Sequence, residues 1–173
     1  MNKFNKLNKF KTLLYVKISL ISLYLALTIP ISYFAISELK IFSIITFFFG
    51  LFLIISITND YVITSEDALS YKTDFISSLL GKSSWKIFWK DIKLIKSFPT
   101  SQGGKVHYFI TNNNKSYLVP QRVENLDQFV SIISNKTKLD TTELDYISPL
   151  WTYKFLTYLS LSMIIGEMIT FII

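Results

Sequence analysis

Three long apolar runs bracket a more polar middle in this chain. Residues 16–37 and residues 41–58 are predominantly apolar, and only the triplet "ELK" separates them. Residues 153–173 form the third run. At about 1.5 Å per residue, each run is long enough to cross the hydrocarbon core of a bilayer. The pattern predicts a two-helix transmembrane hairpin and, after the middle region, a third transmembrane helix.

A cleaved signal peptide is the alternative for the first run. Lysines precede it, and "AIS" near its end resembles a cleavage site. However, the run is longer than the usual hydrophobic region of a signal peptide, and a second apolar run follows at once. We therefore expect the first run to remain as a membrane span.

The middle region predicts short strands joined by turns. Apolar and β-branched side chains alternate with polar ones over short segments, which is typical of half-buried strands. The segments "PTSQGGK" at 99–105 and "NNNK" at 112–115 indicate turns, because glycine, proline and asparagine favour them. The predicted strands cover 61–64, 68–75, 106–111 and 116–120.

The hydrophobic period changes over residues 125–139, which predict a helix. Asn125 is a candidate N-cap, with Gln128 three residues later. Several strands followed by one amphipathic helix predict an α+β domain in which the helix covers an open end or face of the sheet. The apolar side chains on one face of this helix are Leu126, Phe129, Val130 and Ile133.

The segment "SSWKIFWKDIKLIKS", residues 83–97, interleaves lysines with aromatic side chains. As a strand it places Trp85 and Trp89 on one side, with lysines on the other; as a helix it gathers the lysines, but Trp89 falls among them. A strand to about Trp89, a bend over residues 90–92 and a second strand from Lys93 fit best. We therefore predict a bent pair of strands with solvated lysines.

Three interpretations of these lysines stay open. They form an ordinary solvated sheet face, they are attracted to an anionic leaflet at about 1 kcal/mol each, or they bind nucleic acid. A nearly neutral middle region without a recognition motif argues against nucleic acid. The candidate partner- or lipid-binding residues are Trp85, Lys86, Trp89, Lys90, Lys93, Lys96, Gln102 and Lys105.

The net charge of +6 is concentrated near the N-terminus. Residues 1–40 carry six lysines against one acid, Glu38, whereas residues 60–148 carry eleven basic and ten acidic side chains. By the positive-inside rule, the basic N-terminus lies in the cytoplasm. Two crossings return the chain there, so we expect a cytoplasmic middle domain and a C-terminus on the opposite face. The expected location is the plasma (inner) membrane or a thylakoid membrane.

The sequence contains no catalytic or metal-binding motif that we recognise. It has no cysteine and one histidine, His107. The lack of cysteine excludes disulfides and thiolate metal sites, and no phosphate-binding loop, HExxH or GxSxG motif is present. We expect His107 to be a half-exposed strand residue rather than a general base. We therefore expect no enzyme activity, no cofactor and no metal.

Glu167 is a carboxylate near the middle of the third apolar run. An Asp-like charge at such a depth costs at least about 2.5–3.5 kcal/mol, so this side chain should be protonated, hydrogen-bonded or turned towards a partner. At similar depth, the first two spans offer the hydroxyls of Thr28, Ser32 and Thr46. The interpretations are a hydrogen bond that fixes the three helices, docking to another membrane protein, or a proton or ion pathway.

The order of apolar positions and turns in the middle region forms a pattern. Its members are Tyr61, Ile63, Thr64, Leu69, Trp89, Asp91, Ile92, Ile95, the glycine turn, Tyr108, Ile110, Pro120 and Phe129. This pattern resembles the bacterial pleckstrin-homology-like (PH-like) domain, which small membrane proteins carry after a helical hairpin. The resemblance implies a seven-stranded β-sandwich or barrel with a C-terminal helix, and it implies no catalytic residues.

A second resemblance rests on the hairpin and on the segments "WKDIKLI", "KVHYFI" and "LVP". Together with the closing helix, they are similar to a photosystem I assembly factor family of cyanobacteria and chloroplasts. That family has two N-terminal spans and a similar stromal domain. The lysine-rich arm and the third span of this chain depart from it.

These features predict a non-enzymatic integral membrane protein whose PH-like domain binds a membrane-protein partner, in assembly or maintenance of a membrane complex. The alternative is a module that senses anionic membrane lipids. No nucleic acid is expected, and no oligomeric state is predicted. The expected divisions are a basic N-terminal arm (1–15), the transmembrane hairpin (16–58), the cytoplasmic PH-like domain (59–148) and the C-terminal transmembrane helix (149–173).

Overall fold

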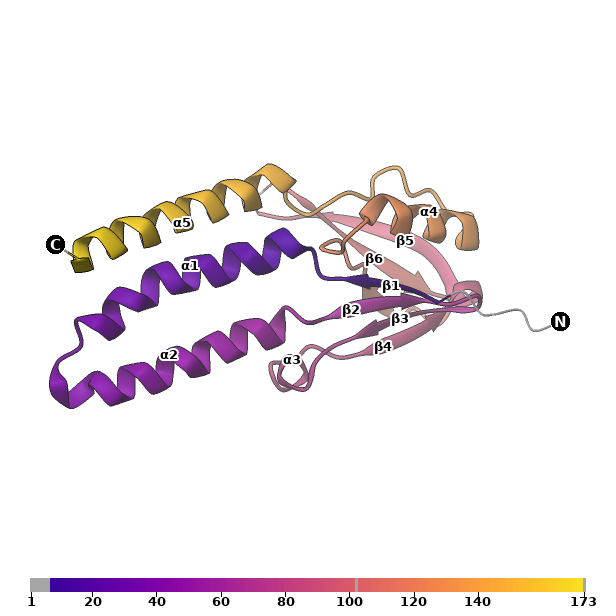
Figure 1. Ribbon diagram of the computed structural model, residues 1–173. Helices are drawn as coiled ribbons and strands as arrows, with labels where there is room; N and C mark the ends of the chain where they lie inside the picture. Colours follow the sequence, from indigo (N-terminus) through magenta and orange to yellow (C-terminus); the bar gives the residue numbers. More distant parts are fainter. Residues whose placement is uncertain (1–6, 102, 173) are drawn as a thin grey trace. The chain divides into compact units, whose positions relative to one another are not determined.

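The computed structural model describes residues 7–101 and 103–172 (Figure 1). The chain divides into two compact units. The sheet unit contains the chain up to Leu13 together with Asn59–Ser148. The helical unit contains Leu14–Thr58 and the chain from Pro149 onward.

The helical unit consists of α1 (Leu14–Tyr33), α2 (Ser37–Ile57) and α5 (Leu150–Ile172). Among the described residues, these three helices are long and apolar enough to span a membrane. Helices are therefore confirmed where the hairpin and the third span were predicted, although α1 begins at Leu14 rather than at residue 16.

Small side chains line the contact between α1 and α5. Ser19, Ser22 and Ala26 of α1 are buried, as are Thr157 and Ser160 of α5. Small residues let two backbones approach closely, which favours helix association in membranes. The hydroxyls are satisfied inside their own helices; the Ser160 hydroxyl, for example, donates to a backbone carbonyl at 2.7 Å.

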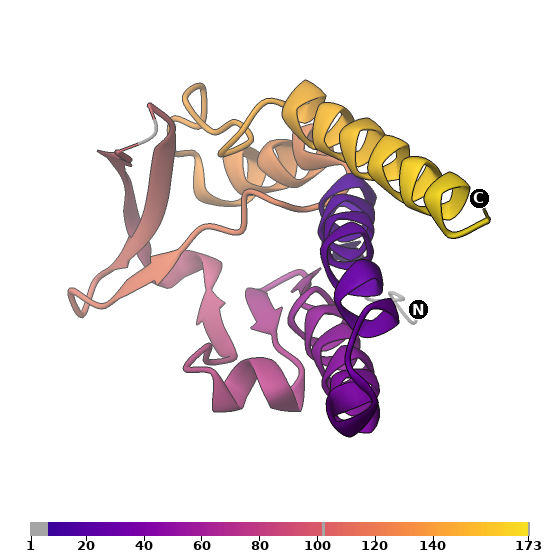
Figure 2. The same cartoon turned by 90° about the vertical axis from the view of Figure 1, so that its left-hand side faces the viewer.

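Helices α1 and α5 run in the same direction (Figures 1 and 2). At one end, the Lys154 ammonium lies 5.2 Å from the centre of the Tyr15 ring. At the other end, the Tyr33 and Phe171 rings stack with centroids 4.1 Å apart. Because α2 returns antiparallel to α1, the start of α1, the end of α2 and the start of α5 all lie at one end of the helical unit.

The sheet unit contains two antiparallel sheets (Figure 2). A four-stranded sheet has the order β1-β2-β3-β4, and a three-stranded sheet has the order β5-β6-β7. The strands are β1 (Asn8–Lys11), β2 (Tyr61–Thr64), β3 (Ala68–Lys72), β4 (Trp85–Phe88), β5 (Ile92–Pro99), β6 (Lys105–Thr111) and β7 (Ser116–Leu118). The helices are α3 (Phe75–Leu79), the 3-10 turn η1 (Trp89–Asp91) and α4 (Leu126–Thr137).

The predicted bend between two strands is confirmed, since η1 joins β4 to β5. The helix predicted near residue 125 is confirmed as α4, whose Leu126, Phe129 and Ile133 are buried. Asn125 is confirmed as the N-cap residue, and its carbonyl accepts from the Phe129 N–H at 3.1 Å, but its side chain does not cap the helix. Asn125 precedes α4 with a left-handed φ of 54° and makes no side-chain capping hydrogen bond.

The expected basic arm over residues 1–15 is corrected by the structure, because its second half folds. Residues 8–11 form β1, which pairs with β2 in the register Phe10↔Val62. The Phe10 side chain is buried, and its ring centroid lies 5.3 Å from that of Phe129 on α4. The sequence interpretation considered only the charge of this segment. It overlooked the strand alternation, which turns Phe10 inward and its lysine neighbours outward. The sheet unit is therefore discontinuous in sequence and includes a strand from before the hairpin.

We predict that Phe10→Ala lowers the free energy of unfolding of the sheet unit by about 3–5 kcal/mol, as for other buried phenylalanines. Lys11→Ala, an exposed change on the same strand, should cost less than about 0.5 kcal/mol. Urea unfolding of the detergent-solubilised protein, followed by the fluorescence of Trp85 and Trp89 in a Trp151→Phe background, measures both. Equal urea midpoints of unfolding for the two variants would indicate that this segment is an arm that does not pack in the sheet unit.

Candidate functional site

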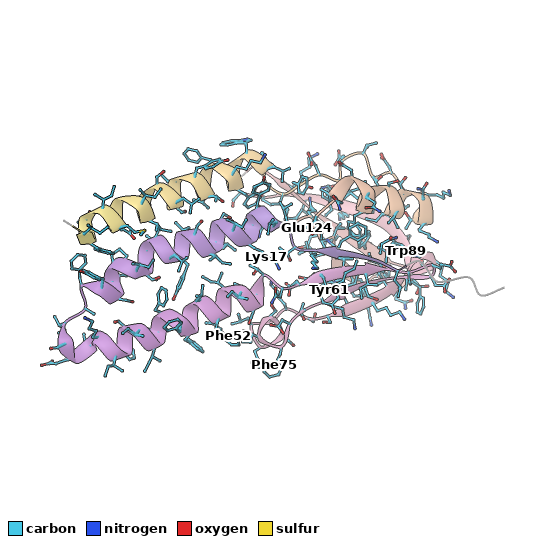
Figure 3. The ribbon with its side chains drawn as sticks, viewed as in Figure 1. Lys17, Phe52, Tyr61, Phe75, Trp89 and Glu124 are labelled. Carbon is cyan, nitrogen blue, oxygen red and sulfur yellow. The ribbon has the colours of Figure 1, made fainter. Side chains whose placement is uncertain are left out.

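The two tryptophans proposed for binding lie inside the sheet unit. The Trp85 ring stacks on Tyr71, with centroids 5.7 Å apart, and lies 5.4 Å from the Tyr117 ring. Trp89 is 5% exposed, and its indole N–H donates to the Ser65 carbonyl at 3.0 Å (Figure 3). Trp89 is therefore a core residue, and the partly buried Trp85 packs against the core.

The lysines of the same segment do reach the surface, but not on one face. Lys86 and Lys90 flank the Phe88 ring at 5.3 and 5.9 Å, on the four-stranded side of the bend. On β5, Lys93 and Lys96 are exposed. The bend at η1 thus divides one sequence segment between two sheets. Of the other candidates, Lys105 pairs with Glu143 at 3.2 Å, and Gln102 lies outside the described residues.

The outer side of the four-stranded sheet is basic. In the strand register, Lys11, Tyr61 and Lys72 form one row across β1, β2 and β3. A second row runs from Lys9 through Ile63 and Ser70 to Lys86 on β4. We name the exposed lysines of these rows the basic face: Lys9, Lys11, Lys72 and Lys86. Sequence reasoning missed it because half of its lysines were assigned to the arm.

The outer side of the three-stranded sheet is mainly apolar, with the exposed Lys96 opposite Tyr108 and its ammonium 5.1 Å from the centre of the Phe98 ring. The register places Leu94 opposite Ile110, Phe98 opposite Val106, and Tyr108 opposite Leu118, all on the side away from buried Phe109. Leu94, Phe98 and Leu118 are 38%, 41% and 47% exposed. We name this group the apolar face: Leu94, Phe98, Val106, Tyr108, Ile110 and Leu118. An antiparallel sheet with one solvated side normally carries polar residues there, so this face is suited to binding.

His107 is fully buried, at 1% exposure, so the expected half-exposed position is wrong. The register sets it opposite Ser97 on the inner side of the sheet, and the Ser97 hydroxyl lies 2.9 Å from the His107 Nδ1. The same hydroxyl donates to Glu143 at 3.2 Å, and Glu143 also pairs with Lys105. Glu143 follows α4 in sequence, so no local pattern could place it beside the histidine.

The environment sets the titration of this cluster. Burial lowers the pKa of His107; the charge of Glu143 opposes that effect and the charge of Lys105 adds to it. A hydrogen bond and charge from Lys105, with a hydrogen bond from Ser97, lower the pKa of Glu143. The His107 Nε2 is buried and has no hydrogen-bond partner among the described residues.

The cluster orders the chain rather than offering a reactive group to solvent. His107 is inaccessible, and its backbone N–H donates to the Gln121 side-chain oxygen at 3.3 Å. The Gln121 amide in turn donates to the carbonyls of Lys105 and Asp145 at 3.1 and 2.7 Å. These bonds attach the segment after α4 to β6. Within the described residues, no group of three or more His, Asp or Glu side chains could hold a metal ion.

The structure does not join Glu167 to the hydroxyls proposed for it. The Thr28 and Thr46 hydroxyls donate to carbonyls of their own helices, Tyr24 at 2.7 Å and Phe42 at 2.9 Å. Ser32 lines an open, mainly apolar groove of about 330 Å³ between α1 and α2. The Glu167 Oε2 has no hydrogen-bond partner among the described residues. The bond that was to fix the three helices is therefore not observed.

Comparison with known proteins finds sequence similarity to a cyanobacterial protein. No family model matches it. It is 28% identical over 144 residues to a protein of Synechocystis sp. named "Uncharacterized protein slr0269", and the alignment covers 80% of this chain and 72% of that one. This similarity supports a cyanobacteria-like origin and assigns no activity.

The buried histidine predicts a stability that depends on pH. Folding lowers the pKa of His107 from its ordinary value of 6.5. Below about pH 6.5, the unfolded chain therefore binds more protons than the folded chain. Stability should therefore fall as the pH drops through about 6.5. Melting temperatures at about pH 7.5 and about pH 5.5 should differ less in His107→Gln than in the unaltered protein. Glu143 titrates below this window, because its pKa is lowered from 4.5. If the melting temperature changed equally with pH in both proteins, His107 would not be the cause of the pH dependence.

Proposed function

We propose that this protein is a non-enzymatic membrane module that binds another integral membrane protein, in assembly or maintenance of a membrane complex. The observation that carries the proposal is the apolar face of the three-stranded sheet. Contiguous exposed apolar surface is uncommon on monomeric soluble domains and marks interaction sites. Aromatic side chains such as Phe98 and Tyr108 are also enriched where proteins bind one another.

The character of the helical unit supports a partner that is itself in the membrane. Helix α2 buries only Ser56 among its residues, and most of its exposed side chains are apolar. Glu167 adds a polar atom that is shielded within its unit yet lacks a hydrogen-bond partner among the described residues. Polar atoms in hydrocarbon favour partners on neighbouring helices, so a second membrane protein that displaced the side chains covering this oxygen would supply the missing hydrogen bond.

The proposal includes a PH-like sheet unit on the cytoplasmic or stromal-side face of a plasma (inner) or thylakoid membrane. Sheets of four and three strands followed by α4 support the PH-like assignment. The concentration of lysine near the N-terminus supports the orientation. The insertion of the hairpin between β1 and β2 is a feature that the resemblance did not include.

The basic face supports a second candidate function, the sensing of anionic lipids. Its four lysines lie on adjacent strands, and no acidic residue occupies the described outward strand positions between them. Each basic residue near an anionic leaflet contributes about 1 kcal/mol, and salt screens that attraction. A packed protein interface depends less on salt, so the two functions are separable.

We predict that a tagged copy purified from its native membranes in mild detergent retains a membrane-protein partner at high salt. Phe98→Ser with Leu118→Ser should reduce recovery of that partner at least about tenfold, because central aromatic and aliphatic contacts dominate binding energy. Lys9→Ala with Lys86→Ala is the matched control and should leave recovery unchanged. Quantitative mass spectrometry of the eluates provides the measurement.

Three results would count against this function. Recovery that is unaffected by the Phe98 and Leu118 changes would remove the apolar face as the binding surface. Recovery of anionic lipid alone, lost at high salt and in the lysine variant, would favour lipid sensing. Recovery of only a second, differently tagged copy of this chain would make the apolar face a self-association surface.

A further inference from the structure

Helix α3 and its C-cap residue, Leu80, present three strongly exposed apolar side chains. Phe75, Leu79 and Leu80 are 74%, 72% and 64% exposed, more than any member of the apolar face. Phe75 and Leu79 are four residues apart and therefore lie on one side of the helix. Figure 3 shows the Phe75 ring on the outside of α3. The helix itself carries no charged residue.

The connection that contains α3 is held in a defined conformation. At its base, the backbone N–H of Thr73 donates to the Ser84 hydroxyl at 3.0 Å. The Asp74 carboxylate caps α3 by accepting from the Phe75 N–H at 2.8 Å. Lys82 closes the connection through an ion pair with buried Asp60 at 2.7 Å. The outward position of the apolar side chains is thus built into the loop.

Strand register places α3 at the end of the four-stranded sheet from which the chain leaves for the membrane spans. Lys11, Tyr61 and Lys72 lie in one row at that end, and α3 follows Lys72. Only two residues separate Lys11 from the start of α1 at Leu14. Three residues separate the end of α2 from Tyr61. A trans chain extends at most about 3.6 Å per residue, so these tethers keep that end of the sheet close to the bilayer surface.

We propose that Phe75, Leu79 and Leu80 insert into the interface of the leaflet from which the chain enters α1, as a non-covalent anchor of the sheet unit. Short tethers leave a bilayer surface within reach of α3. Uncharged Phe and Leu side chains are suited to the boundary between headgroups and acyl chains. Exposed Lys11 and Lys72, in the row next to α3, complement anionic headgroups. The bilayer is the occupant that satisfies both the apolar and the basic groups.

This anchor is separate from the proposed binding of a partner. The apolar face belongs to β5, β6 and β7, whereas α3 connects β3 to β4. Insertion needs no second protein, so it can be tested on the purified chain alone. The partner proposal can therefore be rejected while membrane insertion of α3 is supported. Equally, insertion can be rejected while the partner proposal is supported.

The absence of cysteine in the natural sequence makes a direct test simple. Leu79→Cys and Glu66→Cys are labelled with an environment-sensitive fluorophore, and the full-length protein is reconstituted into phosphatidylcholine–phosphatidylglycerol vesicles. Glu66 is the matched control, since it is exposed in the β2–β3 turn at the opposite end of the same sheet. Each label is then titrated with aqueous iodide and with a lipid-attached quencher.

We expect the Leu79 label to be quenched several-fold more by the lipid-attached quencher than the Glu66 label, and several-fold less by iodide. Adding Phe75→Ser and Leu80→Ser should shift the Leu79 label towards the Glu66 values. The Trp89 fluorescence and melting temperature should be unchanged, because these residues are exposed.

The proposal is overturned if both labels respond equally to iodide in the vesicles. It is also overturned if the Leu79 label is shielded in native membranes but open to iodide in pure lipid, since a protein would then cover α3. Shielding that persists in the Phe75→Ser, Leu80→Ser variant would equally reject insertion by these side chains.

Discussion

The pairing of β1 with β2 is the contact on which the sheet unit depends. Two short strands meet although the whole transmembrane hairpin lies between them in sequence. Thr12 reinforces the junction by donating its hydroxyl to the Asp60 carbonyl at 2.8 Å, and the Leu13 N–H donates to the Arg122 carbonyl at 2.8 Å. The strands can pair only if α1 and α2 form an antiparallel pair that brings the chain back to the side from which it left. Formation of the sheet unit therefore requires the hairpin to return the chain to the side from which it left.

Period-two alternation then assigns different surfaces to the two sheets. In β4 it sends Trp85 inward and Lys86 outward, and in β6 it sends His107 and Phe109 inward and Tyr108 outward. Because η1 bends the chain between the sheets, the outward residues before and after it belong to different faces. One face is basic, whereas the other is mainly apolar around Lys96. The two functions proposed above would therefore use different surfaces of the sheet unit.

The elements that local patterns specify were predictable. Continuous apolar runs located the three helices, and the switch to a helical period located α4 with its buried face. The failures involve partners that are distant in sequence. A four-residue strand such as β1 has little signal of its own, and its lysines dominated the charge pattern. Likewise, His107 was assigned half-exposure because its companions Ser97 and Glu143 come from different segments of the chain.

The sequence alone determined where the chain is apolar enough to span a membrane, where strands and helix alternate, and that thiol chemistry is absent. These properties follow from composition and from the local spacing of apolar residues. They do not depend on which distant residues come into contact in the fold. Only the tertiary structure decided that Asn8–Lys11 completes a sheet, that Trp89 is buried while Trp85 packs against the core, and that α3 projects its apolar side chains at the tethered end. Each of these depends on strand register, which sets residues distant in sequence opposite one another.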